Sequence, residues 1–325
     1  MLATLHPDLT LVFATSDKSV GEAVAPRLGL PASTLRFTSH DDGVKLSRGV
    51  DVVVLASSAE HAVKLAPVIA EHARVVDLSG AFRLDAAAYP TWYGFEHAAP
   101  SDLARAFYGL PELFGAPPKD TRIVANPGCY ATAALLATAP LLADRLAEPG
   151  SVIIDGKSGI SGAGRRAEER YSFVELAEEV RAYKVGTHAH TPEIARYLQR
   201  HARVADGPRV TFTPHLVPLR RGLVVTAYMT ARSGATTESV RASLEKAYAQ
   251  KPFVTVVGIE DVSAHAATGT PLAVVGACVT GDTIVSMCAL DNLMKGAASQ
   301  AMQNVNALLG LPEAAGLSTS ARFAP

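Results

Sequence analysis

The stretch RIVANPGCYAT, residues 122–132, puts a cysteine where an apolar strand turns into a helix. After the apolar residues, Asn126-Pro127-Gly128 is a turn signal, because Pro fixes φ and Gly permits close backbone approach. The Ala/Leu-rich run from Tyr130 to Ala139 predicts a buried helix that ends near Pro140. Cys129 is therefore expected at a helix N-terminus, where unpaired N–H groups and the helix dipole favour a thiolate.

The helix end alone is too weak to ionise this cysteine. A thiol has an ordinary pKa of about 8.5, and a helix terminus contributes roughly 0.3–1 kcal/mol, which is less than about one pKa unit. A cysteine that is mostly thiolate at neutral pH also needs a cationic partner, usually a histidine. Without such a partner, Cys129 would be a small buried residue at a helix start.

The composition indicates a small-molecule enzyme of about two domains. The chain has 325 residues, 48% of them hydrophobic, and a formal net charge of −1. It therefore lacks the basic field that would attract nucleic acid or an anionic membrane. Cys129, Cys278 and Cys288 show no C-x-x-C spacing, which fits a reducing cytoplasm and argues against disulfides and a thiolate metal site. No stretch resembles a signal peptide or a transmembrane helix.

The N-terminal third has the rhythm of a doubly wound parallel sheet. Strands are expected at 9–14, 50–56 and 74–78, with a helix at 59–71 between the last two. Ligands of such sheets bind at the carboxyl ends of the strands. Ser16, Ser57 and Ser79 are therefore expected in loops that face the ligand cleft.

The usual start of a dinucleotide-binding domain does not precede this pattern. Residues 1–7 resemble the tail of its first helix, and no Gly-rich pyrophosphate turn comes before them. The first strand of such a sheet is central, so the strands at 9–14 and 50–56 would each have an unpaired edge. We therefore expect the gene to begin upstream, with about twenty further residues that carry the strand and the turn.

The remaining chain predicts a mostly antiparallel sheet with helices on one face. A strand at 151–155 leads into a Gly-rich loop, 156–166, whose amides, Lys157 and Arg165-Arg166 suit an anion. A flexible surface loop is the alternative. Alternating strands are expected at 209–214, 222–231, 253–259, 273–280 and 282–290, with a hairpin turn at Gly281-Asp282, a helix at 237–249 and a last helix at 293–309 that returns to the first domain.

Two histidines precede another helix, for which Thr191 is the expected N-cap and Pro192 the first residue. His188 and His190, at i and i+2, would share a face in an extended segment. No third ligand lies at zinc spacing, which disfavours a metal site. The pair is either structural or supplies a base for Cys129.

Two further patches carry charged or polar anchors. Arg220 and Arg221 would bind a carboxylate or a phosphate, or form solvated surface charge. Asn292, at a strand end, either faces the presumed cleft or caps the last helix. Cys278 and Cys288 lie in alternating strands and are expected in the core.

Taken together and in this order, these segments resemble the N-acetyl-γ-glutamyl-phosphate reductases of arginine biosynthesis. The resemblance is carried by the histidine stretch and by DLSGAFRL (77–84), YGLPE (108–112), NPGCY (126–130), KSGISGAGR (157–165), FTPHL (212–216) and DNLMKGAA (291–298). It implies a two-domain fold like that of aspartate-semialdehyde dehydrogenase. We expect a dinucleotide-binding domain of 1–127 with 291–325, and a catalytic and oligomerisation domain of 128–290.

The resemblance also implies the chemistry. Cys129 is the expected nucleophile and His188, or less directly His190, the expected base; NADPH reduces an acyl phosphate to a semialdehyde in a cytoplasmic homodimer or homotetramer. The implied substrate-binding residues are Asn126, Arg83, Lys157, His190 and Arg221. The implied cofactor-binding residues are Ser16, Ser57, Ser79, Ser158, Gly159, Gly162 and Asn292.

Two substitutions depart from the family pattern. Asp17 stands where an arginine is usual, which would weaken contact with the 2′-phosphate of NADP unless Lys18 replaces it, and Ala189 replaces an arginine between the histidines. The alternatives are an N-acetyl-aminoadipyl-phosphate or aspartyl-phosphate reductase, a cofactor-free thiol hydrolase or acyltransferase, and a truncated inactive homologue.

Overall fold

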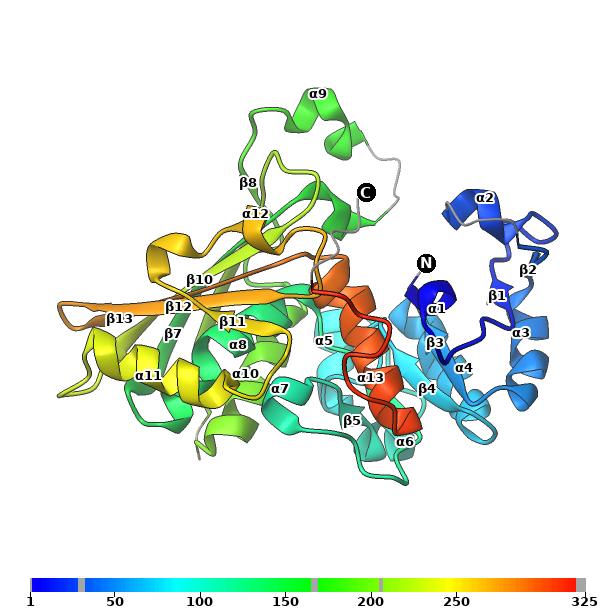
Figure 1. The fold of residues 1–325 in the computed structure, drawn as a ribbon, viewed down its shortest axis with the longest axis horizontal. Helices are drawn as coiled ribbons and strands as arrows, with labels where there is room; N and C mark the ends of the chain where they lie inside the picture. Colours follow the sequence, from blue (N-terminus) through cyan, green and yellow to red (C-terminus); the bar gives the residue numbers. More distant parts are fainter. Residues whose placement is uncertain (1, 29–32, 165–168, 205–206, 320–325) are drawn as a thin grey trace. The chain divides into compact units, whose positions relative to one another are not determined.

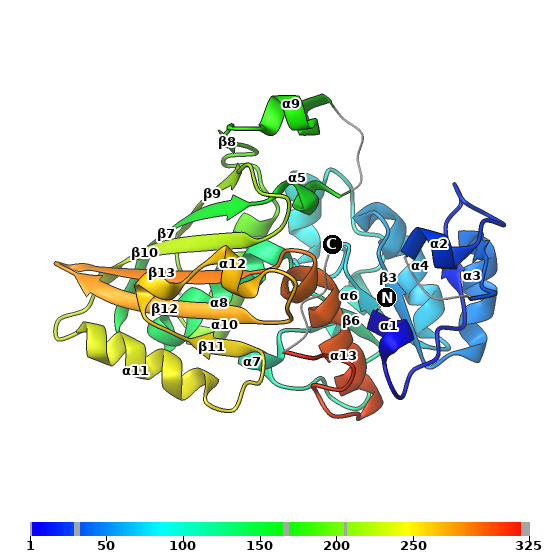
Figure 2. The same cartoon turned by 45° about the horizontal axis from the view of Figure 1, so that its top comes forward.

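The computed structural model describes residues 2–28, 33–164, 169–204 and 207–319 (Figures 1 and 2). The chain forms two compact units. The first comprises Met1–Gly109, Ala116–Asn126 and Ala301–Leu317, and the second comprises Leu110–Gly115, Pro127–Gln300 and Ser318–Pro325. These units differ from the expected domains at 110–115, 127, 291–300 and 318–325, which belong to the second unit. The expected division of function between domains stays a prediction.

The first unit is built on a parallel sheet of four strands in the order β3-β4-β6-β5. The strands are β3 (Val52–Leu55), β4 (Arg74–Asp77), β5 (Phe107–Tyr108) and β6 (Ile123–Ala125). Their apolar, β-branched residues suit a buried parallel sheet. Helix α4 (Ala59–Ala70) connects β3 to β4 and packs on both, which confirms the predicted Rossmann-like β-α-β arrangement.

A separate pair of parallel strands, β1 (Ala14–Thr15) and β2 (Phe37–Thr38), also lies in this unit. The strand expected at 9–14 was wrong in extent. A strand continues only while a neighbour offers backbone hydrogen bonds, and β2 is two residues long. The other elements of this unit are α1 (Leu2–Leu5), α2 (Val24–Leu28), α3 (His40–Leu46), η1 (Ser47–Gly49), η2 (Ala86–Ala88), α5 (Tyr89–Tyr93) and α6 (Pro100–Arg105).

The second unit is built on seven strands in the order β11-β12-β13-β10-β7-β9-β8. They are β7 (Ala147–Ser158), β8 (Arg181–Ala182), β9 (Val210–Leu216), β10 (Leu223–Ala231), β11 (Val254–Val256), β12 (Ala273–Thr280) and β13 (Thr283–Leu290). Neighbours are antiparallel except β7 with β9 and β11 with β12. The predicted mostly antiparallel sheet is therefore confirmed, with two parallel pairs that the alternation pattern did not indicate.

Three long helices cover one face of this sheet (Figure 1). They are α8 (Cys129–Ala143), α10 (His190–Ala202) and α11 (Thr237–Tyr248). The predicted hairpin turn is confirmed, because Gly281 has φ +59° between the paired Thr280 and Thr283. The shorter elements are α7 (Pro111–Phe114), η3 (Ile160–Ala163), η4 (Glu169–Tyr171), α9 (Phe173–Leu176), η5 (Ile259–Asp261) and α12 (Ala264–Ala267).

The last helical segment changes character along its length. It begins as a π-helix, η6 (Met294–Ala298), with i→i−5 bonds from Gly296 N–H to Asp291 O and from Ala298 N–H to Leu293 O, both 2.9 Å. It continues as α13 (Ser299–Leu309) and ends at Gly310, whose φ is +71°. From Ala301 on, it belongs to the first unit, as the predicted return requires.

Helix α8 does not end at Pro140, as its sequence predicts, but runs on to Ala143. Pro140 has no N–H to donate to Leu136 O, four residues earlier. The buried Tyr248 of α11 donates its hydroxyl to that carbonyl at 2.6 Å instead. A tertiary hydrogen bond thus replaces the missing helical one.

We expect Tyr248→Phe to lower the free energy of unfolding by about 1–3 kcal/mol, because the buried Leu136 carbonyl loses its donor. In a Pro140→Ala background, the introduced alanine supplies its own backbone N–H to that carbonyl, and the same substitution should cost less. Urea unfolding of the four proteins in this cycle measures the difference. An equal cost in both backgrounds would contradict the explanation.

Candidate functional site

Cys129 is the first residue of α8 and is half-buried. The preceding Gly128, at the N-cap, donates its N–H to Glu193 Oε1 of α10 at 2.9 Å. A side chain at position 128 would collide with the His190 ring. On its other side Cys129 contacts the π-helix, where a Cβ at Gly296 would lie 2.7 Å from Cys129 Cβ. Two glycines therefore allow the close packing that holds the cysteine.

Aromatic and imidazole rings gather around this cysteine turn. The His188 and His190 centroids lie 4.6 Å apart, and His188 also packs against Tyr183 at 5.6 Å and Phe212 at 5.4 Å. Tyr130, next to Cys129, lies 6.0 Å from His188 and 6.1 Å from His190. The structure thus brings both predicted histidines to the helix end that carries the predicted nucleophile.

His188 is neutral in this setting. Its burial, then His190 and the Lys184 ammonium, lower the pKa of His188 to about 2, although Glu193 opposes the shift. His188 Nδ1 accepts the N–H of His190 at 3.1 Å, so the neutral ring carries its proton on Nε2. His188 is therefore a hydrogen-bond donor here and not the cationic partner that the sequence argument required.

The same bond corrects the predicted helix start. The helix begins at His190 with Ala189 at the N-cap, and Thr191 lies inside the first turn, where its N–H donates to His188 O at 2.9 Å. The His188 ring takes the capping role expected of the Thr191 hydroxyl.

Two phenol groups complete the surroundings of Cys129. Burial raises the pKa of Tyr183 to about 12 and raises that of Tyr130 further, and a charge on Cys129 acts in the same direction on both. The Tyr130 hydroxyl donates to His215 O at 3.0 Å. Both phenols therefore stay protonated beside the cysteine.

The Gly-rich loop does not present unpaired amides to a ligand in its described part. The N–H groups of Gly159, Ile160 and Ser161 donate to carbonyls of residues 219–222 at 2.8–3.1 Å. At Gly159 a Cβ would lie 2.8 Å from Leu219 O, which explains the glycine. Arg165 and Arg166 lie outside the described residues.

Asn292 joins this loop to the turn beside it. Its side-chain oxygen accepts the Gly222 N–H at 2.9 Å, and its amide donates to Ser161 Oγ at 2.8 Å. Gly162 lies against the same amide, and Ser158 is buried with its hydroxyl 3.0 Å from Gly159 O. Asn292 is thus neither a simple helix cap nor openly exposed, and the predicted cofactor contacts of these residues remain proposals.

Of the anion-binding residues predicted in this unit, Arg221 is held in a buried ion pair and Lys157 lies on the far face of the sheet. Arg221 forms a 2.8 Å ion pair with Asp291, which is fully buried and also accepts the Gly269 N–H at 2.7 Å. Lys157 lies on the sheet face opposite Tyr130, because its neighbour Gly156 faces the Tyr130 ring and strand side chains alternate. The structure therefore does not bring Lys157 to the cysteine side of the sheet.

In the first unit, three predicted residues lie at one edge of the parallel sheet. Ser57, Ser79 and Asn126 follow the carboxyl ends of β3, β4 and β6. Asn126 is buried and accepts the Asn304 amide at 3.0 Å. Ser16 follows β1, in the separate two-stranded sheet. Arg83 is buried and donates to Leu78 O at 2.8 Å.

Sequence reasoning missed the buried polar partners of these residues. Glu193, Asp291 and Asn304 are each fully buried and hold Gly128, Arg221 and Asn126 respectively. Glu193 follows the two histidines, Asp291 is the first residue of the segment DNLMKGAA, and Asn304 lies in a run of amides, Gln300 to Asn306, in an otherwise apolar helix. A polar residue on a face expected to be buried was the available signal.

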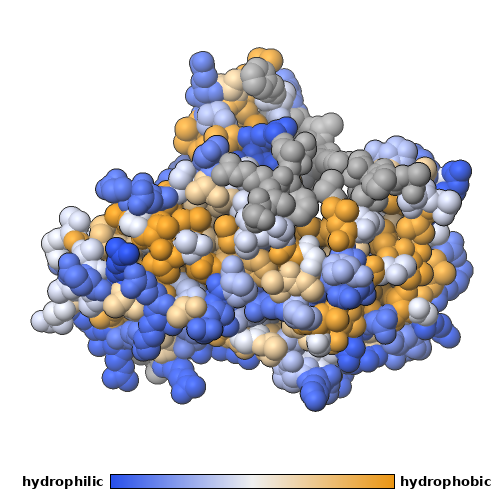
Figure 3. Space-filling view, viewed as in Figure 1, coloured by the Kyte–Doolittle hydropathy of each residue, from blue (hydrophilic) through white to orange (hydrophobic). Residues whose placement is uncertain are grey.

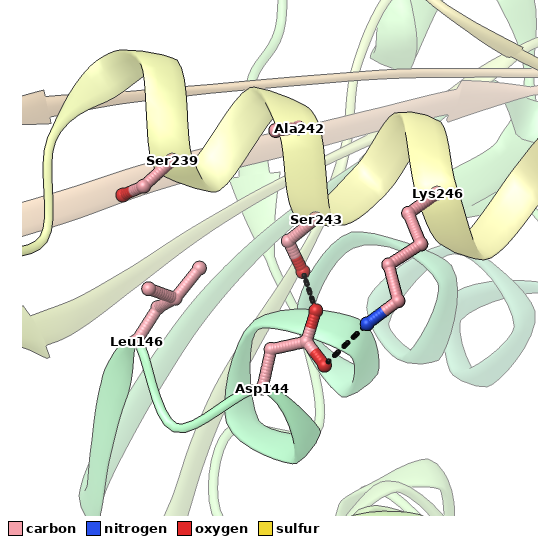
Figure 4. Close-up of a pocket in the computed structure, with 6 residues that line it drawn as sticks. All are labelled: Asp144, Leu146, Ser239, Ala242, Ser243 and Lys246. Carbon is pink, nitrogen blue, oxygen red and sulfur yellow. Dashed lines mark hydrogen bonds and ion pairs between the residues drawn. The ribbon is translucent and has the colours of Figure 1, made fainter.

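A surface pocket lies at the opposite end of α8 from Cys129 (Figure 4). Asp144 in it accepts the Ser243 hydroxyl at 3.0 Å and lies 3.5 Å from Lys246. The helix rises about 1.5 Å per residue, so this pocket is roughly 20 Å from the cysteine and is not its site. Among the described residues no three His, Cys, Asp or Glu side chains gather to hold a metal ion, and no helix is long and apolar enough to cross a membrane.

Comparison with known proteins agrees with this geometry. Residues 1–120 match the family model of the semialdehyde dehydrogenase NAD binding domain, and residues 129–292 match that of the semialdehyde dehydrogenase dimerisation domain. The N-acetyl-gamma-glutamyl-phosphate reductase of Dehalococcoides mccartyi strain BAV1 is 40% identical over 97% of this chain and 92% of its own. The chain belongs to the N-acetyl-γ-glutamyl-phosphate reductase family.

Other members of the reductase family match similarly, and the fold is shared more widely. The enzyme of Rhodospirillum rubrum is 40% identical over 99% of this chain and 94% of its own. Aspartate semialdehyde dehydrogenase II of Vibrio cholerae, 19% identical, superposes with a TM-score of 0.71 over 95% of this chain and 93% of its own. The chain is thus an oxidoreductase of this family with a nicotinamide-dinucleotide-binding domain, and the predicted resemblance and fold class are confirmed.

We expect Gly296→Ala to slow alkylation of Cys129 and to reduce turnover at least tenfold. The added methyl group would meet Cys129 Cβ at 2.7 Å, and a displacement of about 1 Å at a reacting group can cost two orders of magnitude. Iodoacetamide kinetics and steady-state rates measure both effects. Gly150→Ala is the matched control, because a Cβ at Gly150 would meet nothing within 4 Å. Equal alkylation rates in both variants would refute the packing argument.

Proposed function

We propose that this protein reduces N-acetyl-γ-glutamyl phosphate to N-acetylglutamate 5-semialdehyde and phosphate with NADPH, in arginine biosynthesis in the cytoplasm. The observation that carries the proposal is the 40% identity to the named reductase along nearly the whole chain, with Cys129 at a helix start beside two histidines. The rival thiol hydrolase or acyltransferase would leave the parallel sheet of the first unit without a use.

In the proposed mechanism, Cys129 Sγ attacks the acyl carbon and the carbon–oxygen bond to phosphate breaks, leaving a thioester and inorganic phosphate. The neutral His188 donates its Nε2–H to the substrate carbonyl oxygen, where negative charge develops. Glu193 keeps the Gly128 N–H occupied and so holds the start of α8 in place. His190, whose ring lies against Gly128, is the group we assign to the thiol proton.

The first unit fits a nicotinamide dinucleotide at the carboxyl edge of its parallel sheet. Ser57 and Ser79 are half-buried there, and Ser58 caps α4, so hydroxyl groups and a helix N-terminus face the same edge. Asp17, where the family usually has an arginine, accepts the backbone N–H of His40 at 2.8 Å, so this hydrogen bond occupies one of its carboxylate oxygens. When bound, NADPH supplies the hydride that reduces the acyl group.

Of the remaining predicted site residues, those held in place by the contacts described above keep their assigned roles as part of this proposal, and Lys157, on the opposite face of the sheet, does not. Arg221, held by Asp291, and Asn126, held by Asn304, would bind the substrate through positions fixed by buried partners. Ser158, Gly159, Gly162 and Asn292 would shape the cofactor side of the site.

The test is phosphate-dependent reduction of NADP by N-acetylglutamate semialdehyde, the reverse reaction, with wild type and Cys129→Ser. We expect the variant to lose more than about 99.9% of the rate, because removal of a nucleophile costs far more than the ~1.4 kcal/mol that a tenfold loss represents. A variant that kept a tenth of the rate would exclude the covalent mechanism. N-acetyl-aminoadipate semialdehyde and aspartate semialdehyde, tested in parallel, decide the acyl chain.

We also propose that the chain forms a homodimer through the sheet face that α8, α10 and α11 leave uncovered. Ile153 is 45% exposed on that face, and Tyr228, Val285 and Cys278 are only half-buried. Figure 3 shows a hydrophobic area over strands β10 and β12. The name of the matching model, a dimerisation domain, agrees with this use of the face.

Ile153→Asp should raise the dimer dissociation constant at least tenfold, because a charge would be buried at the centre of an apolar face. Val68→Asp is the matched control, since Val68 is also 45% exposed but lies on α4. Mass photometry over a dilution series gives both constants. A monomeric wild type, or an equal response to both substitutions, would reject this interface.

A further inference from the structure

Among the described residues, the predicted anchors Arg221 and Lys157 do not offer the substrate phosphoryl group an unpaired cation on the cysteine side of the sheet. Arg221 is bound to the buried Asp291 at 2.8 Å, and Lys157 lies on the opposite face of the sheet. Lys295 is fully buried and bound to Glu112 at 2.5 Å. Arg221 and Lys295 are thus each paired with a buried carboxylate, and Lys157 faces away from the cysteine side of the sheet.

Lys184 differs from these cations. In the part of the chain that the structure describes, its ammonium makes no ion pair, and the side chain is exposed. It lies close enough to His188 for its charge to lower the pKa of that imidazole. The residue before it, Tyr183, packs its ring against His188 at 5.6 Å.

The backbone holds Lys184 in an unfavourable conformation. Its φ is +47°, in the left-handed region that side chains with a Cβ avoid. The neighbouring Tyr183 N–H donates to Pro214 O at 3.0 Å, and Lys184 O accepts the Thr187 N–H at 3.0 Å in a turn whose Gly186 has φ +73°. Strain that the surrounding structure enforces at a non-glycine residue points to a function for that side chain.

We infer that Lys184 binds the phosphoryl group of the acyl-phosphate substrate, and inorganic phosphate in the reverse reaction; this rests on the proposed function. A lysine ammonium binds a dianionic phosphoryl group as a point charge, and the fork of an arginine would bind the same group through two hydrogen bonds. At this position the lysine stands beside His188, and its charge stabilises the phosphate as the bond to the acyl carbon breaks. Lys184 is thus a specificity-determining residue that sequence motifs did not indicate.

The test varies inorganic phosphate in the reverse assay with Lys184→Met, Lys184→Arg and a control, Lys246→Met. Lys246 is an exposed lysine in the pocket at the far end of α8. We expect Lys184→Met to raise KM for phosphate about 10- to 100-fold, in line with loss of one charge-assisted bond. Its KM for the semialdehyde should stay within about twofold, and Lys184→Arg and the control should resemble wild type.

Lys184→Gly separates binding from folding. Glycine accepts a positive φ without strain, so this variant should unfold at a temperature no lower than wild type and still show the raised KM for phosphate. An unchanged KM in Lys184→Met, or a rise in the KM of the semialdehyde alone, overturns the inference while the enzyme remains active. A wild type without phosphate-dependent NADP reduction would instead reject the proposed function.

Discussion

The hydrogen bond from the Gly128 N–H to the buried Glu193 carboxylate fixes the geometry on which the cysteine site depends. It joins the N-terminus of α8, which carries Cys129, to the first turn of α10, which follows His188 and begins at His190. A buried carboxylate without a donor would cost several kcal/mol, so the two helix starts cannot separate cheaply. The glycine is required because the His190 ring fills the place of a side chain.

Buried carboxylates also accept backbone N–H groups at two other turns of this protein. Asp77, fully buried, accepts the N–H groups of Ser79 and Ala81 and so forms the turn after β4. Asp291 accepts those of Leu293 and Met294 at the start of the π-helix. The Lys295–Glu112 pair, fully buried, fastens that π-helix to α7. Removing one partner of such a pair typically costs about 3–5 kcal/mol, because the other charge is left buried alone. The pair itself adds little net stability, because burying both charges removes their hydration, so its main effect is on conformation.

The charges around Cys129 follow from this construction. Glu193 supplies a buried negative charge, and burial together with Lys184 keeps His188 neutral by lowering its pKa. A site of this kind offers an anionic substrate hydrogen-bond donors from neutral groups, with positive charge at its exposed side. An acyl phosphate is charged at its phosphoryl end and uncharged at the acyl carbon, which matches this distribution.

The sequence alone determined the class of fold and the position of Cys129 at a helix start. Apolar β-branched runs with a helix between them require a parallel sheet, alternation requires a sheet with one covered face, and the Pro-Gly turn before an Ala/Leu-rich run requires a helix start at Cys129. These signals lie in neighbouring residues, so they can be recognised from the sequence alone.

Helix α8 shows what the sequence could not determine. The helix continues through Pro140 because the Tyr248 hydroxyl, 112 residues along the chain, donates a hydrogen bond to the Leu136 carbonyl. Which lysine lies near His188 was likewise decided by tertiary structure. Lys157 and Lys184 look alike as residues, but strand pairing turns Lys157 to the opposite face, while a tight turn holds Lys184 beside His188. Strand register and ion pairs join residues that are far apart in the chain, so they cannot be predicted from a local sequence pattern.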